Sequence, residues 1–311
     1  VTLTATDGSN NTHSVTAKVT VEDNIDPVAV AQNITVQLDA NGQASITTAD
    51  VDNGSSDNCT FTLSLDKTSF DCTNLGANTV TLTATDGSNN THSVTATVTV
   101  EDNIDPTITA PAAVTVNVDA GTCAAALANV TLGTPTIADN CSATASNDAP
   151  ASFPLGNTTV TWTATDGSGN TATATQIVTV VDNIDPTITA PADVTVNVDA
   201  GVCSTALSNV TLGTPTTSDN CSVASVTNDA PTSFPLGNTT VTWTVTDGAG
   251  NTTTATQTVT VIDNIDPTIT CPSDITAYAD ATTNGTSVTW SPAVASDNCT
   301  VVSLTSDIAS G

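Results

Sequence analysis

Residues 241–261 read Val-Thr-Trp-Thr-Val-Thr-Asp-Gly-Ala-Gly-Asn-Thr-Thr-Thr-Ala-Thr-Gln-Thr-Val-Thr-Val. Apolar and polar residues alternate on both sides of the central Asp-Gly-Ala-Gly-Asn run, which is typical of two antiparallel strands joined by a turn. Successive side chains of a strand point to opposite faces, so one face of each strand is apolar and the other carries threonines. The stretch therefore predicts a long β-hairpin with one buried face.

The chain before this hairpin shows further short strands. We predict strands at 194–198, at about 203–212 and from 221 to about 226, separated by Asp, Gly and Pro residues. The Phe-Pro-Leu-Gly run at 234–237 predicts an irregular edge segment, and no helical period is present. Six or seven short strands in about 80 residues indicate an immunoglobulin-like β-sandwich.

The same pattern recurs along the chain. The run Asp-Asn-Ile-Asp-Pro occurs four times, ending at Pro27, Pro106, Pro186 and Pro267, and this spacing suits a small domain with its own core. The predicted fold class is all-β, with tandem immunoglobulin-like β-sandwich domains in a linear array. The predicted domains are 27–105 (repeat 1), 106–185 (repeat 2) and 186–266 (repeat 3), with the closing hairpin of an incomplete repeat at 1–26 and the opening half of another at 267–311.

The two incomplete repeats need completion. Residues 1–26 match residues 80–105 except for Lys18 in place of Thr97. Half a sandwich cannot bury its inner face, so we expect each half to be completed by further chain or by strands of a neighbouring molecule. Joining the two halves directly would lack the Phe-Pro-Leu-Gly segment, which favours a longer chain over strand donation.

Charge and composition exclude several classes of protein. The chain has 31 acidic residues and only two basic ones, Lys18 and Lys67, for a net charge of -29, so nucleic acid is excluded as a partner. Apolar residues make up 38% of the sequence, too many for a disordered acidic tail. No apolar run approaches the roughly 20 residues of a membrane helix, so we expect no membrane span in this segment.

The eight cysteines fall two per repeat, one always in Asp-Asn-Cys and the other at varying positions. This arrangement predicts disulfides within each repeat; free thiols or a metal remain the alternative, although two cysteines cannot supply the four ligands of zinc. Each bond would stabilise its repeat by roughly 3 kcal/mol, and disulfides indicate an extracellular or cell-surface location. The predicted pairs are Cys59–Cys72, Cys123–Cys141, Cys203–Cys221 and Cys271–Cys299.

Three classes of aspartate recur in every complete repeat: the pair in Asp-Asn-Ile-Asp-Pro, the aspartate of Asp-Asn-Cys and the aspartate of Thr-Asp-Gly. All three lie at one end of an immunoglobulin-like sandwich, where bare carboxylates would repel and Ca²⁺ would turn that repulsion into binding. The predicted calcium ligands are Asp23, Asp26, Asp57, Asn58 and Asp86 in repeat 1; Asp102, Asp105, Asp139, Asn140 and Asp166 in repeat 2; Asp182, Asp185, Asp219, Asn220 and Asp247 in repeat 3; and Asp7, Asp263, Asp266, Asp297 and Asn298 in the incomplete repeats.

The competing interpretation is that these residues only cap turns, which Asp and Asn do readily. We favour that explanation for a further set of aspartates beside Ala, at Asp39, Asp119, Asp199 and Asp280. Trp162, Trp243 and Trp290 each occupy an apolar position of an alternating strand and are expected in the core.

Two stretches resemble a known family. The run from Phe153-Pro-Leu-Gly through Trp162 to Asp166-Gly-Ser-Gly-Asn170, and Cys271-Pro-Ser-Asp-Ile-Thr followed by Ser296-Asp-Asn-Cys299, are similar to the hyalin repeat, HYR, an extracellular immunoglobulin-like module. The cysteines depart from the family pattern, since only Cys271 holds its usual first-strand position. The resemblance implies tandem modules of surface or secreted adhesive proteins, which we expect to be bacterial, and no catalytic activity. The junctions are also similar to the calcium-binding linkers of cadherins.

These observations favour a structural function. There is no nucleophile and base set and no segment that departs from the repeat, so we predict that the chain is not an enzyme. We predict a segment of an extracellular filament or cell-surface rod, stiffened by calcium and disulfides, whose partners are further copies of the same repeat, with glycans as a further candidate. The alternative is a ligand-binding adhesin module, which a different terminal domain in the flanking sequence would reveal.

Overall fold

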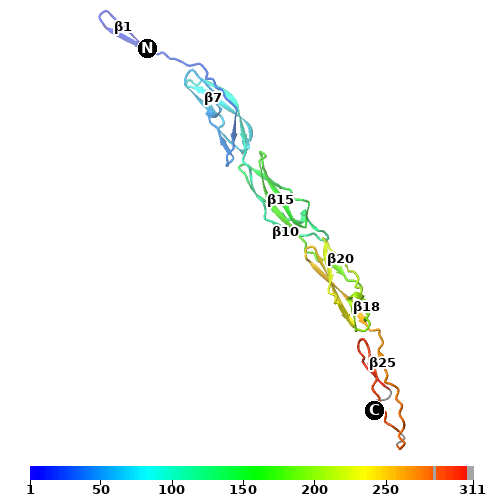
Figure 1. Ribbon diagram of the computed structural model, residues 1–311. Helices are drawn as coiled ribbons and strands as arrows, with labels where there is room; N and C mark the ends of the chain where they lie inside the picture. Colours follow the sequence, from blue (N-terminus) through cyan, green and yellow to red (C-terminus); the bar gives the residue numbers. More distant parts are fainter. Residues whose placement is uncertain (283–284, 307–311) are drawn as a thin grey trace. The chain divides into compact units, whose positions relative to one another are not determined.

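The computed structural model describes residues 1–282 and 285–306 and is built almost entirely of β-strands (Figure 1). Residues 283–284 and 307–311, which belong to the predicted domain 267–311, lie outside the described residues. The chain forms two compact units, which divide repeat 2 between them. Unit 1 comprises 1–114, 131–149 and 159–177, and unit 2 comprises 115–130, 150–158 and 178–311.

Repeat 1, in unit 1, is a sandwich of a four-stranded and a two-stranded sheet. The larger sheet has the order β3-β8-β7-β5, with β3 parallel to β8 and the other neighbours antiparallel. The smaller sheet pairs β4 with β6. The elements are β3 (Ile34–Gln37), β4 (Gln43–Ser45), α1 (Thr48–Val51), β5 (Phe61–Leu65), β6 (Ser69–Asp71), the 3-10 turn η1 (Cys72–Asn74), β7 (Gly76–Asp86) and β8 (Thr91–Glu101).

Unit 1 also contains a separate hairpin and part of repeat 2. The hairpin pairs β1 (Thr2–Thr6) with β2 (Thr12–Thr16). In repeat 2, β9 (Thr107–Thr109) pairs with β12 (Thr136–Ala138), and β13 (Ala143–Asn147) pairs with β15 (Gly156–Asp166). Strands β13 and β15 belong to a four-stranded sheet with β10 (Val114–Asn117) and β16 (Thr171–Val181). Its order is β10-β16-β15-β13, which corresponds to the order in repeat 1.

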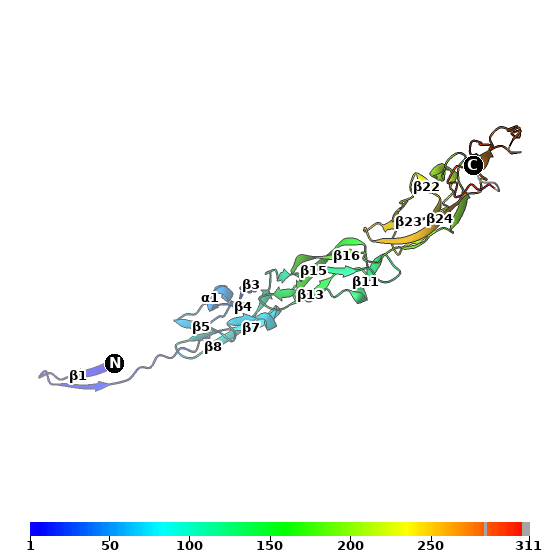
Figure 2. The ribbon, with the colours of Figure 1, turned by 90° about the horizontal axis from the view of Figure 1, so that it is seen from below.

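Unit 2 repeats this architecture around the hairpin predicted at 241–261. Its four-stranded sheet has the order β18-β24-β23-β21, and four small sheets pair β17 with β20, β19 with β22, β25 with β26 and β11 with β14. The long strands β23 and β24 lie side by side in Figure 2. The elements are β17 (Thr187–Thr189), β18 (Val194–Asn197), β19 (Ser204–Ala206), η3 (Leu207–Asn209), β20 (Thr216–Ser218), β21 (Val223–Asn228), β22 (Ser233–Pro235), β23 (Gly237–Asp247), β24 (Thr252–Ile262), β25 (Thr268–Thr270) and β26 (Val294–Ser296), together with β11 (Ala124–Ala126), η2 (Leu127–Asn129) and β14 (Ser152–Pro154) of repeat 2.

The all-β tandem fold is confirmed, and three local predictions are corrected. The strand predicted at 203–212 ends at Ala206, because the chain turns into η3 there. The segment at 234–237 is not irregular at its start: Phe234 lies in β22, opposite Thr205, and is fully buried. Repeat 1 contains one short helix, α1, whose first turn is held by the Asp50 carboxylate accepting hydrogen bonds from the Thr47 backbone and hydroxyl groups.

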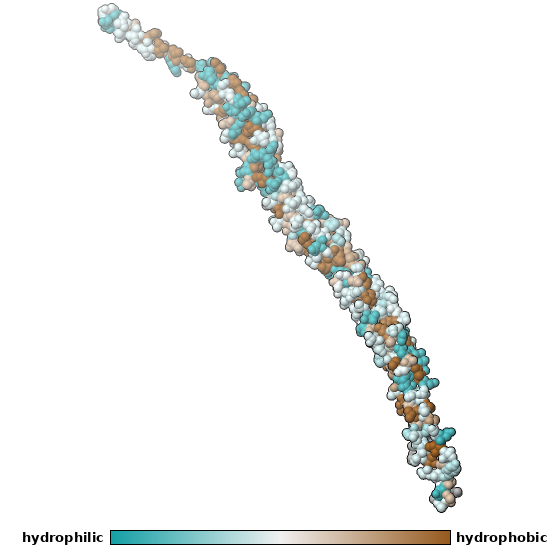
Figure 3. Space-filling view, viewed as in Figure 1, coloured by the Kyte–Doolittle hydropathy of each residue, from teal (hydrophilic) through white to brown (hydrophobic). Residues whose placement is uncertain are grey.

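Alternation along the long strands separates core from surface. In β23, Val241, Trp243 and Val245 are buried, and the threonines between them lie on the outer face opposite threonines of β24. Much of the surface in Figure 3 is accordingly white to pale teal, the colours of intermediate hydropathy. Burying the apolar face is the main source of stability in such a sheet.

A buried glutamine organises the core of each of the last two complete repeats. In repeat 3, the Gln257 side chain is 1% exposed; its Oε1 accepts from Trp243 Nε1 at 3.1 Å, and its Nε2 donates to the carbonyl oxygens of Ala192 and Leu212 at 2.7 and 2.8 Å. Gln176 makes the equivalent bonds to Trp162, Ala112 and Leu132 in unit 1. The predicted core positions of Trp162 and Trp243 are confirmed, whereas Trp290 is only half-buried.

The β1–β2 hairpin has an exposed apolar face. Val1 and Leu3 are 71% and 60% exposed, whereas the matching Val80 and Leu82 of repeat 1 are fully buried. The expectation that this hairpin is completed by further chain or by a neighbour stays a prediction.

The glutamine network gives a stability prediction. Replacing Gln257 by leucine keeps the volume but leaves the Trp243 N–H and two carbonyl groups without partners, which should lower the free energy of unfolding by about 3 kcal/mol. Urea unfolding measures the change, with the surface substitution Thr256→Ala as control, expected within about 0.5 kcal/mol of the parent. A Gln257→Leu variant as stable as the parent would contradict the role given to this network.

Candidate metal sites and disulfide bonds

Three segments converge at one end of each complete repeat. In repeat 2, Asp102 follows β8, Asp139 follows β12, and Asp166 ends β15. The Asp102 carboxylate accepts a hydrogen bond from the backbone N–H of Ile104, and the Asp139 carboxylate accepts one from that of Cys141, both at 3.1 Å. These bonds fix each carboxylate on its own loop.

The turn that carries the third carboxylate is tied to the junction. The Asp166 carboxylate accepts hydrogen bonds from the backbone N–H groups of Ser168 and Asn170 and from the Asn170 side chain. Asn170 Nδ2 also donates to the backbone carbonyl of Asp102 at 2.9 Å. Asn90 and Asn251 make the same pair of contacts in repeats 1 and 3. Sequence reasoning missed these asparagines, although each stands four residues after its aspartate.

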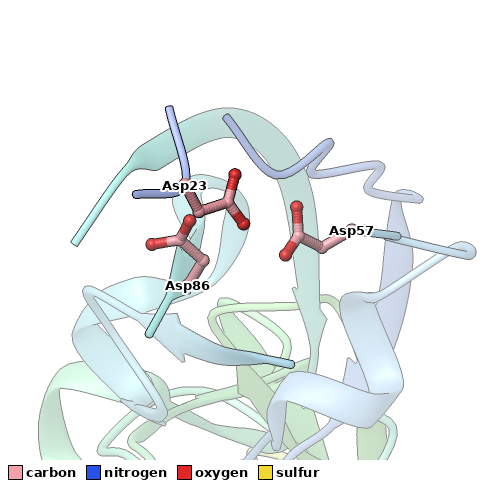
Figure 4. A group of neighbouring side chains, drawn as sticks. All are labelled: Asp23, Asp57 and Asp86. Atoms are coloured by element: carbon pink, nitrogen blue, oxygen red, sulfur yellow. The ribbon is translucent and has the colours of Figure 1, made fainter. Parts of the chain in front are cut away.

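Each complete repeat thereby holds a cluster of three carboxylates. One oxygen from each member lies within 4.8 Å of the others. The clusters are Asp23, Asp57 and Asp86 (cluster 1); Asp102, Asp139 and Asp166 (cluster 2); and Asp182, Asp219 and Asp247 (cluster 3). Figure 4 shows the three side chains of cluster 1 gathered from separate segments.

The clusters contain only part of each predicted ligand set. One aspartate of each Asp-Asn-Ile-Asp-Pro run takes part, whereas Asp26, Asp105 and Asp185 are exposed and lie outside the clusters. Asp7, Asp263 and Asp266 are also exposed, and Asp297 is half-buried. Among the described residues, none of these seven belongs to a three-carboxylate cluster. Their role as ligands stays a prediction.

Several oxygens beside the clusters are buried and lack a partner. Asp182, only 8% exposed, has one carboxylate oxygen, Oδ2, without a hydrogen bond. Four further oxygens are also buried without a hydrogen bond: Oδ1 of Asp139 and Asp219, and Oδ1 of the adjoining Asn140 and Asn220. Buried oxygens normally have a partner, and carboxylate and amide oxygens are the ligands that Ca²⁺ prefers. The donor set therefore fits a hard divalent cation.

The repulsion between the clustered carboxylates also favours binding of a cation. Two carboxylates about 5 Å apart repel by about 3 kcal/mol at an effective dielectric constant of about 20. The chain has only two basic residues to offset this. The ammonium group of Lys67 lies 4.7 Å from the centre of the Phe70 ring.

The disulfides connect consecutive repeats, and the predicted pairing within repeats is wrong. The bonds are Cys72–Cys141, Cys123–Cys221 and Cys203–Cys299, while Cys59 and Cys271 are exposed and unbonded. None of the predicted pairs Cys59–Cys72, Cys123–Cys141, Cys203–Cys221 and Cys271–Cys299 forms. In each bond, the Asp-Asn-Cys cysteine of one repeat joins a cysteine of the repeat before it.

The location of the partner cysteines explains this pairing. A backbone hydrogen bond closes the same turn in each repeat, from the N–H of an aspartate to a carbonyl oxygen further on: Asp39 to Gln43, Asp119 to Ala124 and Asp199 to Ser204. The residue just before each acceptor therefore occupies a matching turn position, and these residues are Gly42, Cys123 and Cys203. A Cβ on Gly42, whose φ is +71°, would lie 2.6 Å from Cys72 Sγ. Cys72 therefore fills the space that a side chain at the turn position would take. The partner cysteine therefore varies in its position in the sequence, but its sulfur lies at the same turn of the fold in each repeat.

This turn contacts the next repeat directly. Asn140 Nδ2 donates to the backbone carbonyl of Asp39 at 3.3 Å, Asn220 Nδ2 to that of Thr122 at 2.9 Å, and Asn298 Nδ2 to that of Val202 at 3.2 Å. The Asp39 carboxylate accepts hydrogen bonds from the backbone N–H groups of Asn41 and Gln43, as expected of a turn residue.

Comparison with known proteins agrees with this architecture. The model of the HYR domain matches residues 101–180 and 181–261, together more than half of the chain, so the chain belongs to the HYR domain family. This family is a non-enzymatic structural repeat, and disulfide-bonded HYR modules are typical of extracellular proteins.

Two curated relatives are sea urchin hyalins. The chain is 30% identical to hyalin of Strongylocentrotus purpuratus over 56% of its length and 33% identical to hyalin of Lytechinus variegatus over 55%. It spans only 15% and 34% of the lengths of these relatives. Neither match supports the expected bacterial source.

Solved structures with similarity include extracellular cadherin domains. The protocadherin GammaB4 extracellular domain matches with 13% identity over 88% of this chain and 61% of that chain, at a TM-score of 0.34. Mouse cadherin-23 EC22-24 matches with 13% identity over 76% of this chain and 99% of that chain, at a TM-score of 0.32. Scores this low carry no argument about the site. Among the described residues, no helix has the length and hydropathy needed to cross a membrane.

The hydrogen bonds at Asp247 predict a dependence of stability on pH. Burial by itself raises the pKa of the Asp247 carboxyl, but hydrogen bonds from Asn251, Gly250 and Ala249 together hold that pKa below its usual 3.8. A lowered pKa in the folded state means that Asp247 contributes stability above pH 3.8, which is lost as pH falls through the lowered value.

In calcium-free buffer, the stability difference between the parent and Asp247→Asn should be constant above about pH 5 and shrink below about pH 4. Urea midpoints measured across this range test it. Asp185→Asn, which removes an exposed carboxylate outside the clusters, controls for the loss of one charge. A difference that grows as the pH falls would contradict the assignment.

Proposed function

We propose that the chain is a structural segment of an extracellular filament or cell-surface rod in which Ca²⁺ binds the three carboxylate clusters and disulfides join consecutive repeats. The observation that carries this proposal is that one Asp-Asn-Cys loop contributes both to the carboxylate cluster and to the link with the preceding repeat. It supplies one carboxylate of the cluster and, through the next two residues, a hydrogen bond and a covalent bond to the preceding repeat. A bound cation at this loop would restrict the motion of one repeat against the next.

The residues proposed to hold calcium are the three members of each cluster, with the amide oxygens of Asn140 and Asn220 as further ligands. Three carboxylates provide charge for a divalent ion, and Ca²⁺ accepts six to eight oxygen ligands, so backbone carbonyls and water would complete the shell. The fold restrains these residues before the ion arrives, because the aspartates are held by backbone N–H groups.

Filament formation would use the same junction between further copies of the repeat. Repeat 1 and repeat 3 each carry two different surfaces, the cluster at one end and the turn after β3 or β18 at the other, and a head-to-tail contact between two such surfaces extends without closing. Further HYR repeats are therefore the proposed partners, and the extracellular medium supplies both calcium and the oxidising conditions that keep the disulfides formed.

Calcium binding is the direct test. Isothermal titration of the chain should find about one Ca²⁺ per cluster, and the double substitution Asp219→Asn with Asp247→Asn should remove one of them. At free calcium ten times Kd, each site should stabilise the chain by about 1.4 kcal/mol, so chelation should lower the melting temperature.

The double substitution Asp193→Asn with Asp274→Asn removes the same charge outside the clusters and outside the predicted ligand sets, and should leave the stoichiometry unchanged. Small-angle scattering reports the mechanical part of the proposal, with greater flexibility expected after chelation. Calcium that neither binds nor changes the melting temperature would overturn the proposal.

A further inference from the structure

Three consecutive residues, Asp139, Asn140 and Cys141, each have a different role at the junction of repeats 1 and 2. Asp139 belongs to cluster 2, and its Oδ1 is buried without a partner. Asn140 donates from Nδ2 both to Asp102 Oδ1, at 3.1 Å, and to the Asp39 carbonyl of repeat 1, at 3.3 Å. Cys141 is bonded to Cys72 of repeat 1. Neighbouring Cα atoms are only about 3.8 Å apart, so none of these contacts can shift without the others.

The junction of repeats 2 and 3, within unit 2, is built the same way. Asp219 belongs to cluster 3, Asn220 donates to Asp182 Oδ1 at 3.3 Å and to the Thr122 carbonyl at 2.9 Å, and Cys221 is bonded to Cys123. The buried Oδ2 of Asp182 lacks a partner. Two junctions with different partner cysteines therefore share one arrangement.

We infer that the cation and the disulfide at each of these junctions are thermodynamically coupled, so that bound calcium protects the bridge from reduction and the bridge tightens calcium binding. The inference rests on the calcium binding proposed above. The bridge confines the Asp-Asn-Cys loop against the preceding repeat, so less conformational entropy is lost when the cation orders its ligands. The effect is reciprocal, because linkage requires each event to change the other by the same factor.

The chemical step is thiol–disulfide exchange with a dithiol. A thiolate of reduced dithiothreitol attacks one sulfur of Cys72–Cys141, the protein S–S bond breaks, and the released sulfur takes up a proton. The second thiol of the reagent then closes its ring and releases the other cysteine. The dithiol loses two electrons, and the protein disulfide gains them as two thiols.

The chain contains its own controls. Cluster 1 has the same three aspartate classes, but Cys59 in its Asp-Asn-Cys loop is unbonded. Cys203–Cys299, in contrast, is a bridge whose Asp297 belongs to no three-carboxylate cluster among the described residues. Coupling is expected at clusters 2 and 3 and is absent or smaller at these two places.

The experiment equilibrates the full chain with mixtures of reduced and oxidised dithiothreitol, in calcium or in chelator. Free thiols are then alkylated, and each bridge is quantified by peptide mass spectrometry. Calcium should raise the reduced-to-oxidised ratio needed to open half of Cys72–Cys141 and of Cys123–Cys221 by at least about fivefold, the lower end of ordinary coupling. Asp139→Asn with Asp166→Asn should abolish the shift at Cys72–Cys141 and leave that at Cys123–Cys221 intact.

Calorimetry on the same samples separates the two proposals. Calcium that binds while every bridge opens at an unchanged ratio would overturn the coupling and leave the proposed function standing. Calcium that does not bind would overturn both. If calcium shifted all three bridges equally in the parent and in the cluster 2 variant, a nonspecific ionic effect would replace the coupling.

Discussion

The mutual repulsion of clustered carboxylates is the constraint on which the junctions depend. Each complete repeat brings one oxygen from each of three aspartates within 4.8 Å of the others, in a chain with only two basic residues to offset the repulsion. The fold reduces the repulsion through backbone N–H groups donated to the carboxylates, which hold the clusters in shape. It leaves other oxygens, such as Oδ2 of Asp182, without any partner. Each repeat thus has a buried apolar core, and the oxygen atoms at its carboxylate end suit a cation.

The same end is where the preceding repeat attaches. The glutamine and tryptophan of the core hold the long hairpin, whose turn carries the last aspartate of the cluster, so packing in the core sets the geometry of the site. At the other end of the sandwich, the turn before β4 or β19 offers a carbonyl group to the next repeat. The sulfur comes from Cys72, beside the first of these turns, or from Cys203, within the second. Consecutive repeats of the HYR family in this chain are thus linked by a covalent bond and a hydrogen bond from neighbouring residues.

Local sequence patterns predicted what depends on local chemistry. Alternation fixed the long hairpin around Trp243, and recurrence of Asp-Asn-Ile-Asp-Pro indicated tandem repeats. Convergence of Asp102, Asp139 and Asp166 was also predictable, because the sandwich topology places their loops at one end. The disulfide partners were not, since the prediction paired cysteines within one repeat, such as Cys123 with Cys141, whereas each Asp-Asn-Cys cysteine that is bonded joins a cysteine of the preceding repeat. Only the pairing of β4 with β6 shows that the Cys72 sulfur lies where a side chain at position 42 would lie.

The central claim is that consecutive repeats are covalently joined at the Asp-Asn-Cys loop. Peptide mapping of the chain under non-reducing conditions, with free thiols alkylated before digestion, tests it most directly. The account predicts cross-linked peptides containing Cys72 with Cys141, Cys123 with Cys221 and Cys203 with Cys299, and alkylated Cys59 and Cys271. Cross-links confined within single repeats, such as Cys123 with Cys141, would contradict it.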